Sequence, residues 1–265
     1  MGNTFVVSRT MDFTVYEYAV SGYGDMLFTV DYAKSSTIAT TGERLPVRGG
    51  PSNYKILDID HSTDCTFNAN LPLVDVRALA TKLGRSVVVG AANAFKKEIL
   101  TASASNTVTL AEEPVTGTLK IYKLVGERDP GVQQTAGVPG TTEDKFSIAV
   151  KIVTFNTVSV PSGTKLLITY DYTSGVLAQN VKITANDFPS FITIVGRGLV
   201  DDDQDGKIVP VSFKIHKAKV QPGFELTMES GSATEIPFMT DCYTIVNSTG
   251  DREYVDIVKL NNEAY

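Results

Sequence analysis

The sequence predicts a mostly β protein with one short α-helix, and three observations carry this prediction. Runs rich in β-branched and aromatic residues alternate between apolar and polar positions, which is the period of a strand with one buried face. Turns that contain glycine and proline separate these runs. A single segment, residues 73–83, instead places its apolar residues at helical spacing. The 265 residues are enough for one large β domain or two smaller ones.

The N-terminal part begins with a predicted β-hairpin. Its strands are 13–20 and 26–32, and Gly22 and Gly24 separate them. Two further strands are expected over 54–59 and 65–71, after a turn at Gly49-Gly50-Pro51.

The predicted helix spans 73–83, about three turns. Its apolar residues recur at positions 76, 79, 80 and 83, the spacing of one helix face. Asn70 or Pro72 suits the start, and Gly84 suits the position just past the end. We expect this helix to cover one face or edge of a sheet.

The middle of the chain has shorter apolar runs and more turn residues, and we interpret 93–186 as an inserted second β domain. We expect short strands here, joined by small, turn-rich stretches, at 107–110, 118–122, 146–155 and 165–172. Residues 126–144 have no periodicity, so we expect a long exposed loop.

The last part returns to strongly alternating strands. Val211, Phe213 and Ile215 alternate with polar residues up to His216, which predicts a strand with one buried face. The strands expected in this part are 191–195, 208–220, 224–229, 233–246 and 254–260.

The sequence offers little that points to catalysis, and we expect no enzyme, no catalytic residue and no cofactor site. His61 and His216 are the only histidines, and we read both as surface or hydrogen-bonding residues. A catalytic triad assembles in space, so spacing alone does not exclude one. The chain contains no Gly-x-Ser-x-Gly nucleophile turn, dinucleotide fingerprint or phosphate-binding loop.

Two places raise the question of a metal or a disulfide. Asp201, Asp203 and Asp205, followed by Gly206, match the start of a calcium-binding loop, but position 12 of that loop is Ser212 instead of glutamate. The preferred interpretation is a solvated acidic hairpin tip, so no metal site is predicted. Cys65 and Cys242 are read as buried small residues, with a disulfide as the alternative if their strands meet.

The charge of the chain argues against nucleic-acid binding. It has 24 basic and 30 acidic residues, a net charge of −6, and no basic cluster, whereas proteins that bind DNA neutralise phosphates with Lys and Arg. The sequence has no apolar run of membrane-spanning length, and we expect no membrane contact and no secretory signal.

The C-terminal strands carry a resemblance to a known family. The segments 213–220, 224–229 and 236–240 resemble the closing strands of tail tube and related major tail proteins of phages and prophages. The preceding segment, 194–207, is similar to the region before those strands. Segments 106–110 and 168–172 resemble phage structural proteins more generally.

The resemblance implies two packed antiparallel sheets that form a barrel or sandwich with a flanking helix. On this reading, residues 1–92 and 187–265 form a tail-tube-like domain and 93–186 a β-sandwich-like insert. It also implies hexameric rings stacked into a hollow tube, the conduit for DNA ejection. The expected partners are copies of the chain and the sheath, terminator, baseplate and tape measure proteins. DNA would pass without specific binding, and the protein would be made in the host cytoplasm and reside in the virion tail.

Contact between rings would need a long hairpin or loop, for which segment 35–52 and the N-terminal strand are candidates. Two other functions stay open at this point. One is a different virion role, as a capsid decoration, fibre or baseplate protein. The other is a secreted, calcium-dependent β-sandwich module that binds carbohydrate or mediates adhesion.

Overall fold

The computed structural model describes residues 5–7, 12–49, 51–73, 75–140, 143–202, 208–223 and 235–260. The prediction of a mostly β chain with one short helix is confirmed. The predicted strand 224–229 and the acidic tip at 203–206 lie outside the described residues. Within the described part, no helix is long and apolar enough to cross a membrane.

The chain divides into two compact units. Unit 1 comprises Met1–Val87 and Val181–Tyr265, and unit 2 is Val88–Asn180. The sequence placed the corresponding boundaries near 93 and 186. The identity of these units as a tail-tube-like domain and a β-sandwich-like insert stays a prediction.

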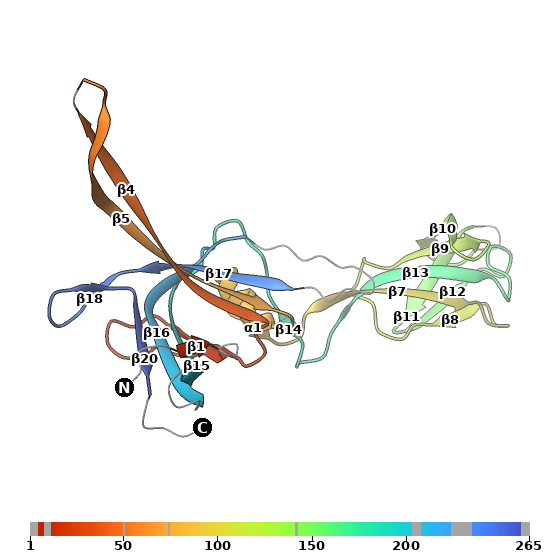
Figure 1. Cartoon of the computed structure of the whole chain (residues 1–265). Helices are drawn as coiled ribbons and strands as arrows, with labels where there is room; N and C mark the ends of the chain where they lie inside the picture. Colours follow the sequence, from red (N-terminus) through yellow and green to blue (C-terminus); the bar gives the residue numbers. More distant parts are fainter. Residues whose placement is uncertain are drawn as a thin grey trace. The chain divides into compact units, whose positions relative to one another are not determined.

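Unit 1 is built on one antiparallel sheet of nine strands (Figure 1). Seven follow the order β3-β2-β15-β16-β17-β5-β4, while β1 pairs with β15 and β20 pairs with β16. The strands are β1 (Phe5–Val7), β2 (Asp12–Glu17), β3 (Met26–Val30), β4 (Ser35–Gly49), β5 (Tyr54–Leu71), β15 (Phe191–Asp202), β16 (Ile208–Val220), β17 (Ile236–Tyr243) and β20 (Val255–Lys259). A short ladder of β18 (Ile245–Val246) and β19 (Arg252–Glu253) lies between β17 and β20 in sequence.

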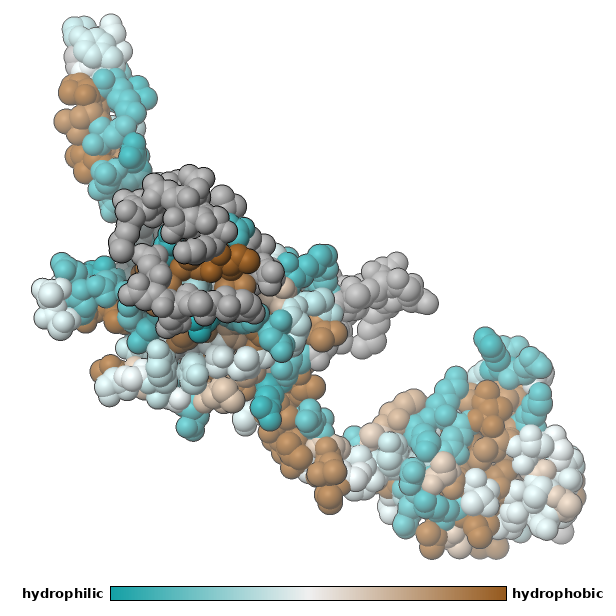
Figure 2. Space-filling model, turned by 60° about the horizontal axis from the view of Figure 1, so that its bottom comes forward, coloured by the Kyte–Doolittle hydropathy of each residue, from teal (hydrophilic) through white to brown (hydrophobic). Residues whose placement is uncertain are grey.

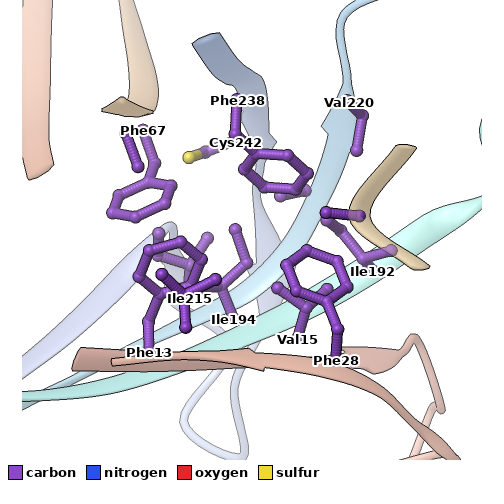
Figure 3. Packing of buried hydrophobic residues seen from close by; sticks show 14 of the residues in the cluster. Phe13, Val15, Phe28, Phe67, Ile192, Ile194, Ile215, Val220, Phe238 and Cys242 are labelled. Carbon is purple, nitrogen blue, oxygen red and sulfur yellow. The ribbon is translucent and has the colours of Figure 1, made fainter. Parts of the chain in front are cut away.

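This sheet curls so that its distant strands face one another across the core. Strands β2 and β5 are four places apart in the sheet, which would separate them by about 19 Å if the sheet were flat. The rings of Phe13 on β2 and Phe67 on β5 nevertheless meet edge to face, with centroids 5.2 Å apart. Phe28 on β3 meets Phe238 on β17 at 5.6 Å. Figure 3 shows these rings converging with Ile194 and Ile215 in a single apolar layer.

Strand β16 follows the alternation that the sequence predicts. Phe213 and Ile215 are buried, whereas Lys214 and His216 are only partly buried on the other face. The predicted strands 54–59 and 65–71 are one continuous strand, β5, so the predicted break between them is wrong. The polar residues 60–64 continue the strand because β4 supplies hydrogen-bond partners along that stretch.

The helix α1 is Val76–Lys82, shorter than predicted. The sequence placed its start at Asn70 or Pro72, but the cap is Asp75, whose carboxylate accepts the N–H of Arg77 at 2.7 Å. Gly84 lies just past the end with φ +69°, as predicted. The Lys82 ammonium is buried and donates to the carbonyl oxygen of Pro237 at 2.7 Å, and burial lowers its pKa. The helix is thereby tied to β17.

Unit 2 is a nearly closed, barrel-like mixed sheet in the order β7-β13-β9-β10-β11-β12-β8. The strands are β7 (Asn93–Thr101), β8 (Thr107–Thr109), β9 (Lys120–Val125), β10 (Asp129–Ala136), β11 (Lys145–Ala149), β12 (Ile152–Phe155) and β13 (Lys165–Thr173). Strands β10 and β11 pair in parallel, and the other pairs are antiparallel. The predicted loop over 126–144 is wrong because β10 lies within it.

Unit 2 has a core of its own, separate from that of unit 1. Ile121, Leu166 and Ile168 are fully buried in it. Tyr170 is also buried and donates its hydroxyl to Glu98 at 2.8 Å, and burial is the main cause that raises its pKa to about 12. The chain enters and leaves this unit through β6 (Val88–Val89) and β14 (Gln179–Asn180), which pair with each other.

Candidate assembly site

Strands β4 and β5 form a long two-stranded arm that projects from the rest of unit 1 (Figure 1). At its base, β17 pairs with β5 over Cys65–Leu71. Beyond that point β5 pairs with β4 alone, and every β5 residue from 54 to 64 is exposed. Eleven residues of strand extend the arm by about 35 Å. The arm is therefore a surface feature whose distal part adds nothing to the core.

One face of the arm is apolar. Leu45 lies directly opposite Ile59, and Val47 lies directly opposite Leu57. Residues two apart in a strand share a face, so these four side chains form one continuous patch, which we call the apolar arm face. Leu45 is 59% exposed, Ile59 51% and Leu57 49%.

The other face of the arm is charged. Arg44 Nε lies 2.9 Å from Asp60 Oδ1, and Lys55 Nζ lies 2.6 Å from Asp58 Oδ2. Figure 2 shows brown and teal atoms on opposite sides of the arm. A two-stranded hairpin without further packing is only marginally stable in water, and a contiguous apolar patch usually marks a contact surface. The two-faced arm therefore has the form of an element that another chain covers on one side.

The two ends of the unit 1 sheet form a second candidate contact. Strands β3 and β4 are the terminal strands of its seven-strand path. In the described residues, β3 pairs only with β2, which leaves the other edge of β3 without a ladder. Met26 on β3 is 58% exposed. An unpaired strand edge is a template for pairing with another chain.

The two cysteines meet in the sheet. Cys242 on β17 lies directly opposite Cys65 on β5, and both are buried free thiols. Burial raises the pKa of both thiols, Cys242 more strongly, and a hydrogen bond between the thiols partly offsets the increase at Cys65. They are therefore protonated, unreactive thiols at neutral pH, in agreement with the preferred reading of buried small residues.

The other residues singled out in the sequence do not converge on one site. His61 is exposed on the arm, whereas His216 is partly buried on β16. Asp201 is the second-last residue of β15, where it pairs with Ile208, while Asp203 and Asp205 lie outside the described residues. The calcium interpretation of that tip stays untested.

Sequence reasoning missed two groupings. It named segment 35–52 as a contact element but not the apolar arm face, which requires the register with β5. It also left out Glu253 and Asp256, which lie beside His216. No signal in the sequence marks that cluster, because its members come from three strands.

The sequence matches one protein-family model over nearly its whole length. Residues 5–257 match the model of the YomU/Tube protein family. None of the curated proteins matches the chain. The match includes both units as well as the arm and the terminal strands of the sheet.

Proposed function

The chain belongs to the YomU/Tube protein family and is a non-enzymatic structural subunit of a phage tail tube, and we propose that it assembles into hexameric rings that stack into a hollow conduit for DNA ejection. The observation that carries the proposal is the arm, which has one exposed apolar face and whose distal part, among the described residues, forms a ladder only between β4 and β5. Such an element gains stability when a second copy covers it.

Ring closure is supported by the ends of the unit 1 sheet. The β3 edge of one subunit can pair with the β4 side of the next, so the sheets join around the ring. A head-to-tail contact of this kind closes into a ring when the rotation per subunit divides a full turn. Closure also removes the unpaired edges that would otherwise promote uncontrolled association.

Stacking of rings is assigned to the arm. Its distal part of about 35 Å is long enough to reach beyond a single sheet-sized subunit. The apolar arm face would lie against the next ring while the face with Arg44 and Asp60 stays in water. The segment 35–52 was one of two candidates from the sequence for joining rings, and its residues 35–49 are β4 of this arm.

The passage of DNA is supported by the charge of the chain. A net charge of −6 per subunit multiplies in a ring of identical subunits, and a negative lumen repels a polyanion instead of holding it. DNA would then slide through without specific binding. The proposed location is the virion tail, with sheath, terminator, baseplate and tape measure proteins as neighbours.

Unit 2 is assigned to the outer surface of the tube. It has its own core and its own sheet, so ring closure does not require it. An outer position leaves the conduit open and presents unit 2 to the surroundings.

Negative-stain electron microscopy and sedimentation of the purified chain over a range of concentrations test the proposal. Rings with six-fold symmetry and stacked tubes are expected above a threshold concentration. A protein that stays monomeric at high concentration, without tubes, would contradict it. Tubes with another rotational symmetry would retain the tube and reject the hexamer.

A further inference from the structure

We propose that His216, Glu253 and Asp256 form a binding site for a divalent metal ion of the zinc type. The three residues come from β16, β19 and β20, and one ligand atom from each lies within 4.8 Å of the others. His216 Nε2 is 3.0 Å from Asp256 Oδ2 and 4.0 Å from Glu253 Oε2. All three belong to unit 1, so the site does not depend on unit 2.

The backbone brings these side chains together on the outer face of the sheet. Lys214 pairs with Asp256 in the β16–β20 ladder, and Ile215 points into the core. His216 is two residues from Lys214, so it shares the face of Asp256 and is its diagonal neighbour. The backbone N–H of His216 also donates to the carbonyl oxygen of Tyr254 at 3.3 Å. Because Tyr254 lies between Glu253 and Asp256 in the chain, this bond holds that segment beside His216.

The imidazole of His216 is in an unusual state for a buried polar group. Its side chain is 12% exposed, and Nε2 is inaccessible to water and makes no hydrogen bond with any residue that the structure describes, although a carboxylate oxygen lies 3.0 Å away. Buried polar atoms nearly always have a partner, and an exception calls for an explanation such as a bound ion. A metal ion between Nε2 and the two carboxylates supplies that partner.

The charges nearby favour a cation. The two carboxylates can bring two negative charges, which a divalent ion balances, and the imidazole of His216 offers a nitrogen ligand. Two lysines of β16 place their ammonium groups over aromatic rings. Lys214 Nζ lies 4.9 Å from the centre of the Tyr23 ring, and Lys217 Nζ lies 4.2 Å from that of Phe191.

The carboxylate of Glu253 is already oriented. Its Oε1 accepts a hydrogen bond from the side-chain amide of Asn247, while Oε2 faces His216. Ligands of metal sites are commonly held in this way by an outer hydrogen bond. Asn247 in turn orders the β18–β19 turn by accepting the N–H groups of Thr249 and Asp251.

The geometry and donor set fit zinc. Zinc bonds to nitrogen and carboxylate oxygen are about 2.0–2.2 Å long, so tetrahedral ligand atoms are about 3.4 Å apart. The distances of 3.0 and 4.0 Å from Nε2 bracket that value. Water can complete the site from the side of Asp256, whose side chain is 49% exposed. One nitrogen and two oxygen ligands suit zinc better than calcium or magnesium, which prefer oxygen alone.

The experiment uses the tag-free full-length chain, stripped with a chelator and titrated with Zn²⁺ by calorimetry. Co²⁺ serves as a second probe because its visible absorption reports the ligand geometry. One ion per chain is expected, with a rise in the melting temperature of unit 1. His216→Gln should remove this site. Loss of an outer hydrogen-bond partner weakens metal binding by about tenfold or more, so Glu253→Gln, which changes a direct ligand, should weaken it at least as much. Circular dichroism confirms that each variant is folded.

The matched control is His61→Gln, which removes the only other histidine of the chain. Its exposed position on the arm makes it the natural source of adventitious binding. The proposal predicts that His61→Gln keeps the stoichiometric site. It is overturned if wild-type protein binds no stoichiometric Zn²⁺, which would leave a plain His216–Asp256 ion pair. It is equally overturned if folded His216→Gln binds Zn²⁺ as wild type does.

Discussion

The apolar arm face makes the proposed contact between rings open to a direct test. The double variant Leu45→Ser/Ile59→Ser removes one of its two directly opposed pairs. Both side chains are already half exposed in the single chain, so each surface change should alter the stability of unit 1 by no more than about 0.5 kcal/mol. The effect should therefore fall on assembly and not on folding.

The size of that effect follows from exposure. Burying a whole Leu or Ile side chain contributes about 1.5–3 kcal/mol. Leu45 and Ile59 are 59% and 51% exposed, so each has roughly half of that still to gain on contact. Together they would contribute about 1.5–3 kcal/mol per subunit. Because about 1.4 kcal/mol is a factor of ten, the critical concentration should rise about 10- to 100-fold.

The assay is sedimentation of assembled tubes over a concentration series, with electron microscopy of each fraction. Arg44→Ser/Asp60→Ser is the matched control, because it places two serines on the opposite face of the same strands and leaves the net charge unchanged. An exposed ion pair contributes about 0.2–1 kcal/mol at most, so the control should assemble nearly as wild type does. The reasoning is refuted if the apolar variant assembles at the wild-type concentration, or if both variants are equally impaired.

Three further predictions concern the two units separately. Phe67→Ala should cost unit 1 about 3–5 kcal/mol and leave the thermal transition of unit 2 in place, as differential calorimetry would show, because Phe67 is fully buried in the unit 1 core. Gly84→Ala should destabilise unit 1 by at least about 1–2 kcal/mol in chemical denaturation, since φ is +69° and a Cβ would lie 2.3 Å from a backbone oxygen. Gly22→Ala, with a similar φ but open space, should cost less. The hydrogen bond from Gln134 is the main cause that lowers the pKa of Asp144, so its stabilising contribution is present above about pH 4 and is lost as the pH falls through the lowered value. Asp144→Asn should accordingly reduce the denaturation midpoint of unit 2 at pH 7, and the difference from wild type should shrink towards pH 3.

The elements that the sequence predicted well are those where burial sets the pattern. Strand β16 alternates over Phe213 and Ile215 because one of its faces packs in the core, and its predicted bounds agree with the structure. Strand β10 was missed because it contains Pro130 and Gly131 and carries an irregular register against β9. Its hydrogen bonds, and not an apolar period, make it a strand. Asp75 was missed as the helix cap because two other residues before the helix also suited that position.

The candidate sites were predictable only in part, because they depend on how strands pair and not on the apolar pattern of one strand. Segment 35–52 stood out as a long element, but the apolar arm face depends on the irregularities at Glu43/Arg44 and Val47/Arg48, which set the register with β5. The cluster at His216 depends on the order of strands in the sheet, which places β20 beside β16. Neither register nor strand order is encoded in the local pattern of a single segment.

The pairing of β6 with β14 has a consequence for how such a chain changes over time. Unit 2 begins at Val88 and ends at Asn180, and these two residues are direct partners in that ladder. Neighbouring strands are about 4.8 Å apart, so the two segments that connect unit 1 to unit 2 are as close together as the two strands of a β-hairpin. A two-residue turn could close it, and another domain with adjacent termini could replace it. A phage lineage or a designer could therefore exchange unit 2 for another domain at this junction without changing the sheet of unit 1.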